Sequence, residues 1–120
     1  MARPMIIGAH TVIFSKDPDA DRAFFRDILR LPNVDAGDGW LIFALPQSEV
    51  AMHPTDKSGA SEFFLMCDDV HAFMTKLKKN GIKCTKATEQ GWGLLTTVTL
   101  PGGGKVGVYQ PRHKRPGKSK

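Results

Sequence analysis

Two stretches of the chain repeat one pattern of apolar and polar positions. In each, an apolar run ends at an acidic turn and an amphipathic segment follows, once from Ala9 to Leu31 and again from Glu62 to Ile82. Apolar residues recur at three- and four-residue spacing after each acidic turn, which is the period of a helix with one buried face. The repeat therefore predicts two related units, each with a strand followed by a helix.

The first unit is expected to begin with a strand over residues 6–15, where β-branched and apolar residues predominate and charge is rare. Asp17 and Pro18 indicate a helix start, because an aspartate accepts hydrogen bonds from the first free N–H groups and proline fits the first helical position. Pro32 ends that helix. The strands predicted to follow span residues 40–45 and 49–53.

The second unit follows the same order. Asp68 and Asp69 precede its helix, lysines crowd the last turns, and Gly81 lies just beyond, which suits the helix dipole and a left-handed cap. The strands predicted around this helix span residues 62–67, 83–89, 93–100 and 105–110. The expected fold class is α+β, with one βαβββ unit at about residues 5–54 and another at about residues 60–111.

Charge is concentrated at one end of the sequence. The net charge is +5, but five of the 17 basic residues lie in residues 112–120, which contain no acid, so residues 1–111 carry 12 basic and 12 acidic residues. Residues 1–111 are expected to form a single domain and residues 112–120 a basic, disordered tail. Nucleic-acid binding is not expected, because the sequence lacks basic residues in helical spacing combined with stacking aromatics.

The hydrophobic content and the two cysteines further limit the class of protein that the sequence can encode. With 41% hydrophobic residues, the chain can bury one core. No apolar run approaches the roughly 20 residues of a membrane span, and the start lacks the apolar core of a secretory signal, so a cytoplasmic location is expected. Cys67 and Cys84 lack the spacing of zinc or redox pairs and are interpreted as reduced core thiols.

Three motifs occur in a characteristic order. They are the run from His10 to Asp17 with Phe-Phe-Arg-Asp-Ile-Leu at 24–29, then Cys67-Asp-Asp-Val70, then Leu100-Pro-Gly-Gly-Gly104. In this order they resemble the vicinal oxygen chelate superfamily, which includes glyoxalase I, bleomycin-resistance proteins, fosfomycin-resistance enzymes and extradiol dioxygenases. The resemblance implies two βαβββ modules, each an incomplete curled sheet, that form a cup, and it implies a homodimer.

In that superfamily the metal ligands come from the first and last strands of the modules. The resemblance places His10 at the first-strand ligand and Glu62 where relatives usually have histidine. The internal repeat supports this match, because each of the two residues stands seven positions before the acidic residue that caps the following helix. Either Glu49 or His53, which share a strand face by alternation, would supply a third ligand.

The last strand departs from the family pattern. Relatives commonly carry a glutamate ligand there, whereas this chain has Gly107, and Tyr109 is a poor replacement. A usual metal-binding carboxylate is therefore missing from the sequence.

Two functions of different class stay open. One is a metal-free protein that binds a small molecule, with an incomplete metal site and with Trp40, Trp92 and Tyr109 as candidate ligand contacts. The other is an enzyme that uses a divalent metal (Fe, Mn, Ni or Zn), held by the three ligands above, as a lyase, isomerase or extradiol-type dioxygenase on a substrate with vicinal oxygens. The absence of a carboxylate at Gly107 favours the first.

Overall fold

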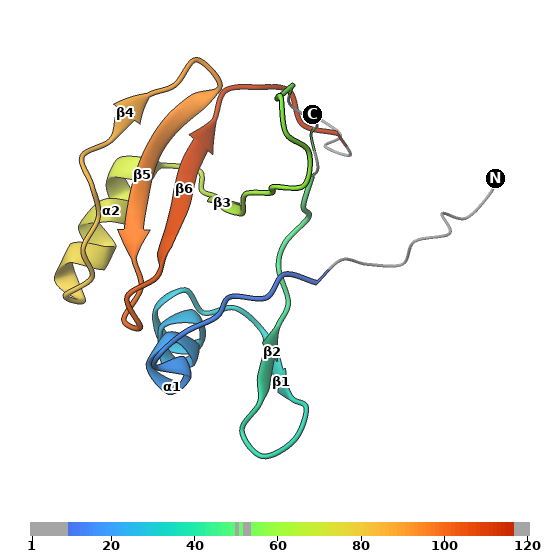
Figure 1. Ribbon diagram of the computed structural model, residues 1–120. Helices are drawn as coiled ribbons and strands as arrows, with labels where there is room; N and C mark the ends of the chain where they lie inside the picture. The colour runs from blue at the N-terminus through green and yellow to red at the C-terminus, as the bar shows by residue number, and fades with distance from the viewer. Residues whose placement is uncertain (1–9, 50, 52–53, 117–120) are drawn as a thin grey trace.

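The second half of the chain forms a four-stranded sheet. In the computed structural model, which describes residues 10–49, 51 and 54–116, its strands are β3 (Phe64–Met66), β4 (Thr88–Glu89), β5 (Gly93–Thr99) and β6 (Lys105–Pro111). Their order in the sheet is β3-β6-β5-β4, with β3 parallel to β6 and the other neighbours antiparallel. Helix α2 (Val70–Lys79) connects β3 to β4 and packs on one face of the sheet (Figure 1).

Helix α2 forms where the sequence specifies both of its ends. The Asp69 carboxylate accepts a hydrogen bond from the N–H of Ala72 at 3.1 Å. Gly81, just past the end, has a φ of +73°, a left-handed conformation that glycine adopts without steric penalty. Between these ends Val70 and Leu77 are fully buried. At 10 residues α2 is the longest helix described, and no described helix is long and apolar enough to cross a bilayer.

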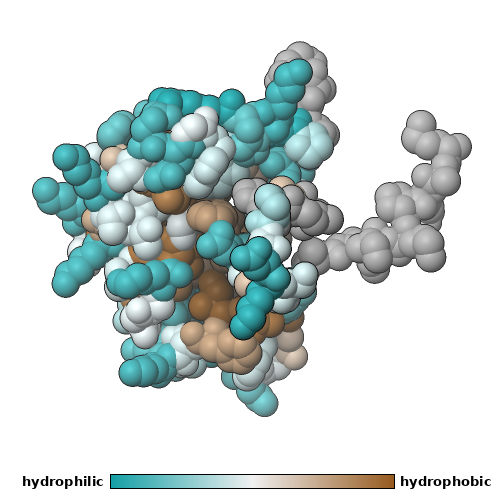
Figure 2. Space-filling view, turned by 45° about the horizontal axis from the view of Figure 1, so that its top comes forward, coloured by the Kyte–Doolittle hydropathy of each residue, from teal (hydrophilic) through white to brown (hydrophobic). Residues whose placement is uncertain are grey.

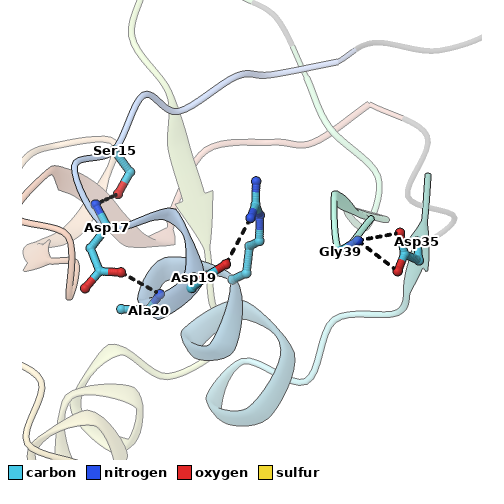
Figure 3. Close-up of polar contacts among 7 residues, drawn as sticks. Ser15, Asp17, Asp19, Ala20, Asp35 and Gly39 are labelled. Atoms are coloured by element: carbon cyan, nitrogen blue, oxygen red, sulfur yellow. Dashed lines mark hydrogen bonds and ion pairs between the residues drawn. The ribbon is translucent and has the colours of Figure 1, made fainter. Parts of the chain in front are cut away.

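The first half begins with a short helical segment. Helix α1 (Pro18–Ala23) continues directly into η1 (Phe24–Ile28), a wider π-helical turn. The Asp17 carboxylate accepts a hydrogen bond from the N–H of Ala20 at 3.1 Å (Figure 3). The helix start predicted at Asp17 is therefore confirmed, with proline at the first helical position.

A two-stranded sheet follows, made of β1 (Asn33–Asp35) and β2 (Leu41–Phe43) in antiparallel pairing. The Asp35 carboxylate closes the connection by accepting hydrogen bonds from the N–H groups of Gly37 at 2.8 Å and Gly39 at 3.2 Å; the Gly39 contact is drawn in Figure 3. Both glycines have positive φ, which the turn requires. Strand β1 lies in a segment for which the sequence predicts no strand.

The segment 10–15 differs from its prediction. The sequence favours a strand buried on both faces, but residues 10–15 form no strand, and Val12 and Phe14 are 61% and 90% exposed. Residues 6–9 of the same predicted strand lie outside the described residues. The prediction is wrong for 10–15 because an apolar run becomes a buried strand only where a neighbouring strand supplies its backbone hydrogen-bond partners.

Two other predicted strands are shorter than expected. Of residues 49–53, Glu49 and Ala51 are not in a strand, and the other three lie outside the described residues. The strand predicted at 83–89 is reduced to β4 and an isolated bridge between Cys84 and Val98. The strands β3, β5 and β6 lie within or almost within their predicted ranges, so the strand–helix–three-strand order is present in the second half.

One apolar core joins the two halves. Its buried members are Phe24, Phe25, Leu77, Val98, Leu100, Val106 and Val108. The phenylalanines come from η1 and the other residues from α2 and the β5–β6 hairpin, so the first helical segment packs at one end of that hairpin (Figure 1). A hydrogen bond from the N–H of Gly102, in the hairpin turn, to the Asp21 carboxylate at 2.7 Å links the same elements.

Residues 112–116, part of the segment predicted as a disordered tail, make specific contacts. The Arg115 guanidinium lies 2.5 Å from the Glu49 carboxylate, and both side chains are largely buried. The carbonyl oxygen of Pro116 accepts a hydrogen bond from the Gln47 amide at 2.5 Å. These contacts hold the segment after β6 against the connection between β2 and β3.

Candidate functional site

An open hollow of about 700 Å³ borders the first half of the chain. It is lined by the segment 10–15, the start of α1, strand β2 with the residues that follow it, and single residues from the second half. Aromatic rings contribute much of the surface, namely Phe25, Trp40, Phe43 and Phe63. Figure 2 shows apolar side chains gathered in a recessed part of one face of the molecule. A hollow of this size and lining suits a drug-sized, largely apolar ligand.

The exposed ring of Trp40 is paired with a cation. The Arg22 guanidinium carbon lies 5.2 Å from the centroid of the indole, within the range of a cation–π contact. The same guanidinium lies 3.2 Å from the Asp19 carboxylate (Figure 3). Trp40 is 66% exposed even so, which leaves much of its ring free for a planar ligand.

A second aromatic cluster lies at β3 and β6, and its members are Phe64, Trp92 and Tyr109. The Trp92 and Tyr109 rings meet edge to face with centroids 4.9 Å apart, and each is 5.8 Å from Phe64. The Tyr109 hydroxyl hydrogen-bonds to Nε2 of His113 at 2.9 Å. Burial raises the pKa of Tyr109 and the nearby Glu49 carboxylate raises it further, so this hydroxyl stays protonated at neutral pH.

The structure separates the candidate ligand contacts into two groups. Trp40 borders the hollow, whereas Trp92 and Tyr109 belong to the second aromatic cluster and do not border it. Of the candidate metal ligands, His10 borders the hollow, whereas Glu62 is exposed just before β3 and does not line the hollow.

The third predicted metal ligand had two candidates. Glu49 is held in its ion pair with Arg115. His53 lies outside the described residues. Among the described residues, no second predicted ligand joins His10 in the lining of the hollow.

Solved structures of similar architecture cover nearly the whole chain. TnmS3, an antibiotic binding protein from Streptomyces sp. CB03234, matches with a TM-score of 0.65 and 22% identity over 90% of this chain and 99% of its own. The lactoylglutathione lyase from Agrobacterium tumefaciens matches with a TM-score of 0.58 and 22% identity over 91% of this chain and 96% of its own. The chain has a glyoxalase-like fold. The predicted α+β class and the resemblance stated from the motifs are thus confirmed at the level of the fold.

A third solved structure is also similar to this chain over most of its length. A glyoxalase/bleomycin resistance protein from Streptomyces sp. CB03234 matches with a TM-score of 0.51 and 18% identity over 80% of this chain and 93% of its own. No protein-family model matches the sequence, and no curated protein matches it significantly. The similarity is therefore one of three-dimensional structure.

The packing around β6 explains why residue 107 is a glycine in this glyoxalase-like fold. A Cβ atom at Gly107 would lie 2.6 Å from Cδ1 of Phe64, directly across the parallel β3–β6 pair. Real side chains do not approach so closely, so the Phe64 ring fills the space that a side chain at position 107 would occupy. The ring of Phe64 thus restricts this position of β6 to glycine.

The described residues do not form a metal centre within one chain. In the ranges 10–49, 51 and 54–116, no three of the His, Cys, Asp and Glu side chains gather closely enough to hold an ion. The Glu49 carboxylate is paired with Arg115, and the Phe64 ring leaves no room for a side chain at position 107. A protein zinc or iron site needs at least three such ligands.

The sequence-based prediction missed three polar residues of the hollow. Arg22, Asp21 and Ser15 line it but were not among the predicted site residues. One signal was present for Asp21, because it stands three and four residues before Phe24 and Phe25 and so shares their face of the helix. A carboxylate on an apolar helix face points to a buried polar contact.

Proposed function

We propose that the chain is a metal-independent binding protein that holds a small, largely apolar and planar molecule in the hollow. The lining of the hollow carries this proposal, since aromatic rings from α1–η1, β2 and the approach to β3 face one space of drug-like size. The description of TnmS3 as an antibiotic binding protein supports the same class of function. The loss of the last-strand carboxylate to the Phe64 ring supports binding without a metal.

A titration with a fluorescent probe tests the proposal. The probe is N-acetyl anthracenylmethylamine, a neutral planar molecule, and binding is followed by anthracene fluorescence in the presence of EDTA. We expect saturable binding by the wild-type protein and a loss of about tenfold in affinity in Trp40→Ala, because a stacked aromatic contact is worth about 1 kcal/mol or more.

Trp92→Ala is the matched control. It removes the same side chain from the second aromatic cluster, away from the hollow, and is expected to leave the affinity within about twofold of wild type. Equal losses in both variants, or no saturable binding by the wild type, would contradict the proposal.

A divalent-metal-dependent enzyme is the second candidate, favoured by the position of His10 at the hollow. In that case Glu62 and a further ligand would have to reach His10, and the metal would act as a Lewis acid on vicinal substrate oxygens. Titration of Mn, Fe, Ni and Zn into wild type, His10→Ala and Glu62→Ala distinguishes the two. Stoichiometric binding lost in both variants would replace the first proposal with this one.

We also propose that two copies of the chain pair. Val12, Phe14 and Val34, all in the first half, are more than half exposed, and exposed large apolar side chains are candidates for an interface. The segment 10–15 makes no strand ladder and offers free backbone groups to a second copy. Light scattering should give the mass of a dimer for wild type and a lower mass for Phe14→Glu, whereas Lys16→Glu should stay dimeric. A monomeric wild type would contradict pairing.

A further inference from the structure

The side-chain carboxylate of Asp21 has one oxygen that accepts a hydrogen bond and one that has no hydrogen-bond partner among the described residues. Only 8% of the residue is exposed. Its Oδ1 accepts the hydrogen bond from the N–H of Gly102 at 2.7 Å, while its Oδ2 is buried and has no hydrogen-bond partner among the described residues. A buried carboxylate oxygen left without a donor loses the hydration it has in water and gains nothing in return. Such an atom in a native fold calls for an occupant that donates to it.

The free oxygen lies beside a second acceptor at the wall of the hollow. Both Asp21 and Ser15 border the hollow. The Ser15 Oγ and the Asp21 Oδ2 are the two atoms nearest to the point where a Cβ on Gly102 would stand, and both are too close to it for any side chain, so the two oxygens are neighbours that pack against the Gly102 backbone. The Ser15 Oγ already accepts the N–H of Asp17 at 3.0 Å (Figure 3), which fixes its position and leaves a further lone pair.

Among the described residues, no cationic side chain forms an ion pair with this carboxylate. The nearest cationic side chain in sequence, Arg22, has its guanidinium bonded to Asp19 and placed over the Trp40 ring. Asp21 is therefore a carboxylate without an ion-pair partner in the wall of the hollow, with a serine oxygen beside it.

Building on the proposed function, we propose that Asp21 and Ser15 form a polar subsite that binds a protonated amine of the ligand. An ammonium group carries several N–H donors and a positive charge, which matches two adjacent oxygen acceptors and one negative charge. A Ca²⁺ ion takes six to eight oxygen ligands, mostly from the protein, and this pair supplies too few for one. The ligand class that follows is a planar aromatic molecule with an amine substituent.

Access to Oδ2 requires a small movement, because the atom is closed from solvent in this structure. Ser15 belongs to the segment 10–15, which is not held by a strand ladder. A shift of this segment is the movement that would open Oδ2 toward the hollow.

The test compares two probes that differ only at the amine. The probes are anthracenylmethylamine, which is cationic at pH 7, and its N-acetyl derivative, which is neutral. Wild type is expected to bind the amine at least about tenfold more tightly than the acetylated form, since a hydrogen bond between charged groups is stronger than a neutral one. Asp21→Asn is expected to abolish this preference while leaving the affinity for the acetylated probe within about twofold.

Asp21→Asn keeps an oxygen for the Gly102 N–H, so the link between the two halves is retained and a thermal melt should show a folded protein. Ser15→Ala should reduce the preference for the amine in part. Asp19→Asn is the matched control: it neutralises a carboxylate two residues away whose side chain is 94% exposed, and the preference should persist.

The possible outcomes distinguish a failure of the amine subsite from a failure of the proposed binding function. Equal binding of both probes by wild type, or an undiminished preference in Asp21→Asn, overturns the amine subsite and leaves the binding function standing. Failure of wild type to bind either probe overturns both. A preference lost in Asp21→Asn and kept in Asp19→Asn supports the subsite.

Discussion

Leu77→Ala is expected to destabilise the protein by about 2–5 kcal/mol, the range for removing a fully buried leucine side chain without collapse of the space it leaves. Leu77 is completely buried and lies in the core that holds residues from both halves of the chain. Its loss therefore weakens the contact of α2 with the sheet and the packing of the first helical segment as well. Urea unfolding followed by circular dichroism gives the free energy of unfolding.

Lys76→Ala is the control for this measurement. It changes the neighbouring residue of the same helix, which is exposed, and should shift the free energy of unfolding by no more than about 0.5 kcal/mol. A loss below 1 kcal/mol in Leu77→Ala would show that α2 is not tightly packed on the sheet.

Gly107→Glu, which introduces a carboxylate on the last strand, is expected to destabilise the protein by about 1–3 kcal/mol through overpacking. The new Cβ would come within 2.6 Å of the Phe64 ring and 3.4 Å of a Leu95 methyl group. Phe64→Ala in the same chain removes the obstructing ring, so the double variant should be more stable than the sum of the two single effects predicts. Thermal melts of the four proteins in the cycle measure this coupling.

Gly104→Glu is the matched control for Gly107→Glu. It introduces the same charged side chain just before β6, where a Cβ would meet only a Leu100 methyl group at 4.0 Å and the backbone has no positive φ. It should melt close to wild type. A Gly107→Glu protein as stable as this control would mean that Phe64 moves aside readily, and a carboxylate could then be accommodated at the last strand.

The second half of the fold could be predicted from the sequence because its signals are local. Asp69 caps α2, the apolar period of the helix continues to Leu77, and Gly81 ends it, so each boundary depends on residues within a few positions. The strands β5 and β6 pair across a short turn, and their alternation survives in the structure as buried residues Val98, Val106 and Val108.

The first half was harder to predict because the composition of a segment does not decide whether a partner strand is present to pair with it. Residues 10–15 have a strand-like composition, yet nothing in their sequence states which strand would pair with them. Strand β1 was missed for the opposite reason: Asn33–Asp35 is polar, and it is extended because β2 and the Asp35 turn hold it.

The candidate site was predicted only in part for a related reason. Two of the predicted site residues, Trp40 and His10, do line the hollow. Trp92 and Tyr109 instead pack against Phe64, because adjacent strands bring their rings together. The role of Gly107 depends on its register with Phe64, forty-three positions earlier, which no local pattern records.

The position of β6 in the sheet also affects how the protein folds during its synthesis. It follows every other described strand in the chain, yet it lies inside the sheet, with β3 on one side and β5 on the other. A nascent chain that has emerged from the ribosome only as far as Gly104 already carries β3, α2 and β5, but β3 has no partner and the apolar face of α2 has only part of its sheet. Parallel pairing over so long a separation forms slowly. During synthesis the second half therefore exposes apolar surface until β6 emerges, and it should depend on chaperones over that interval.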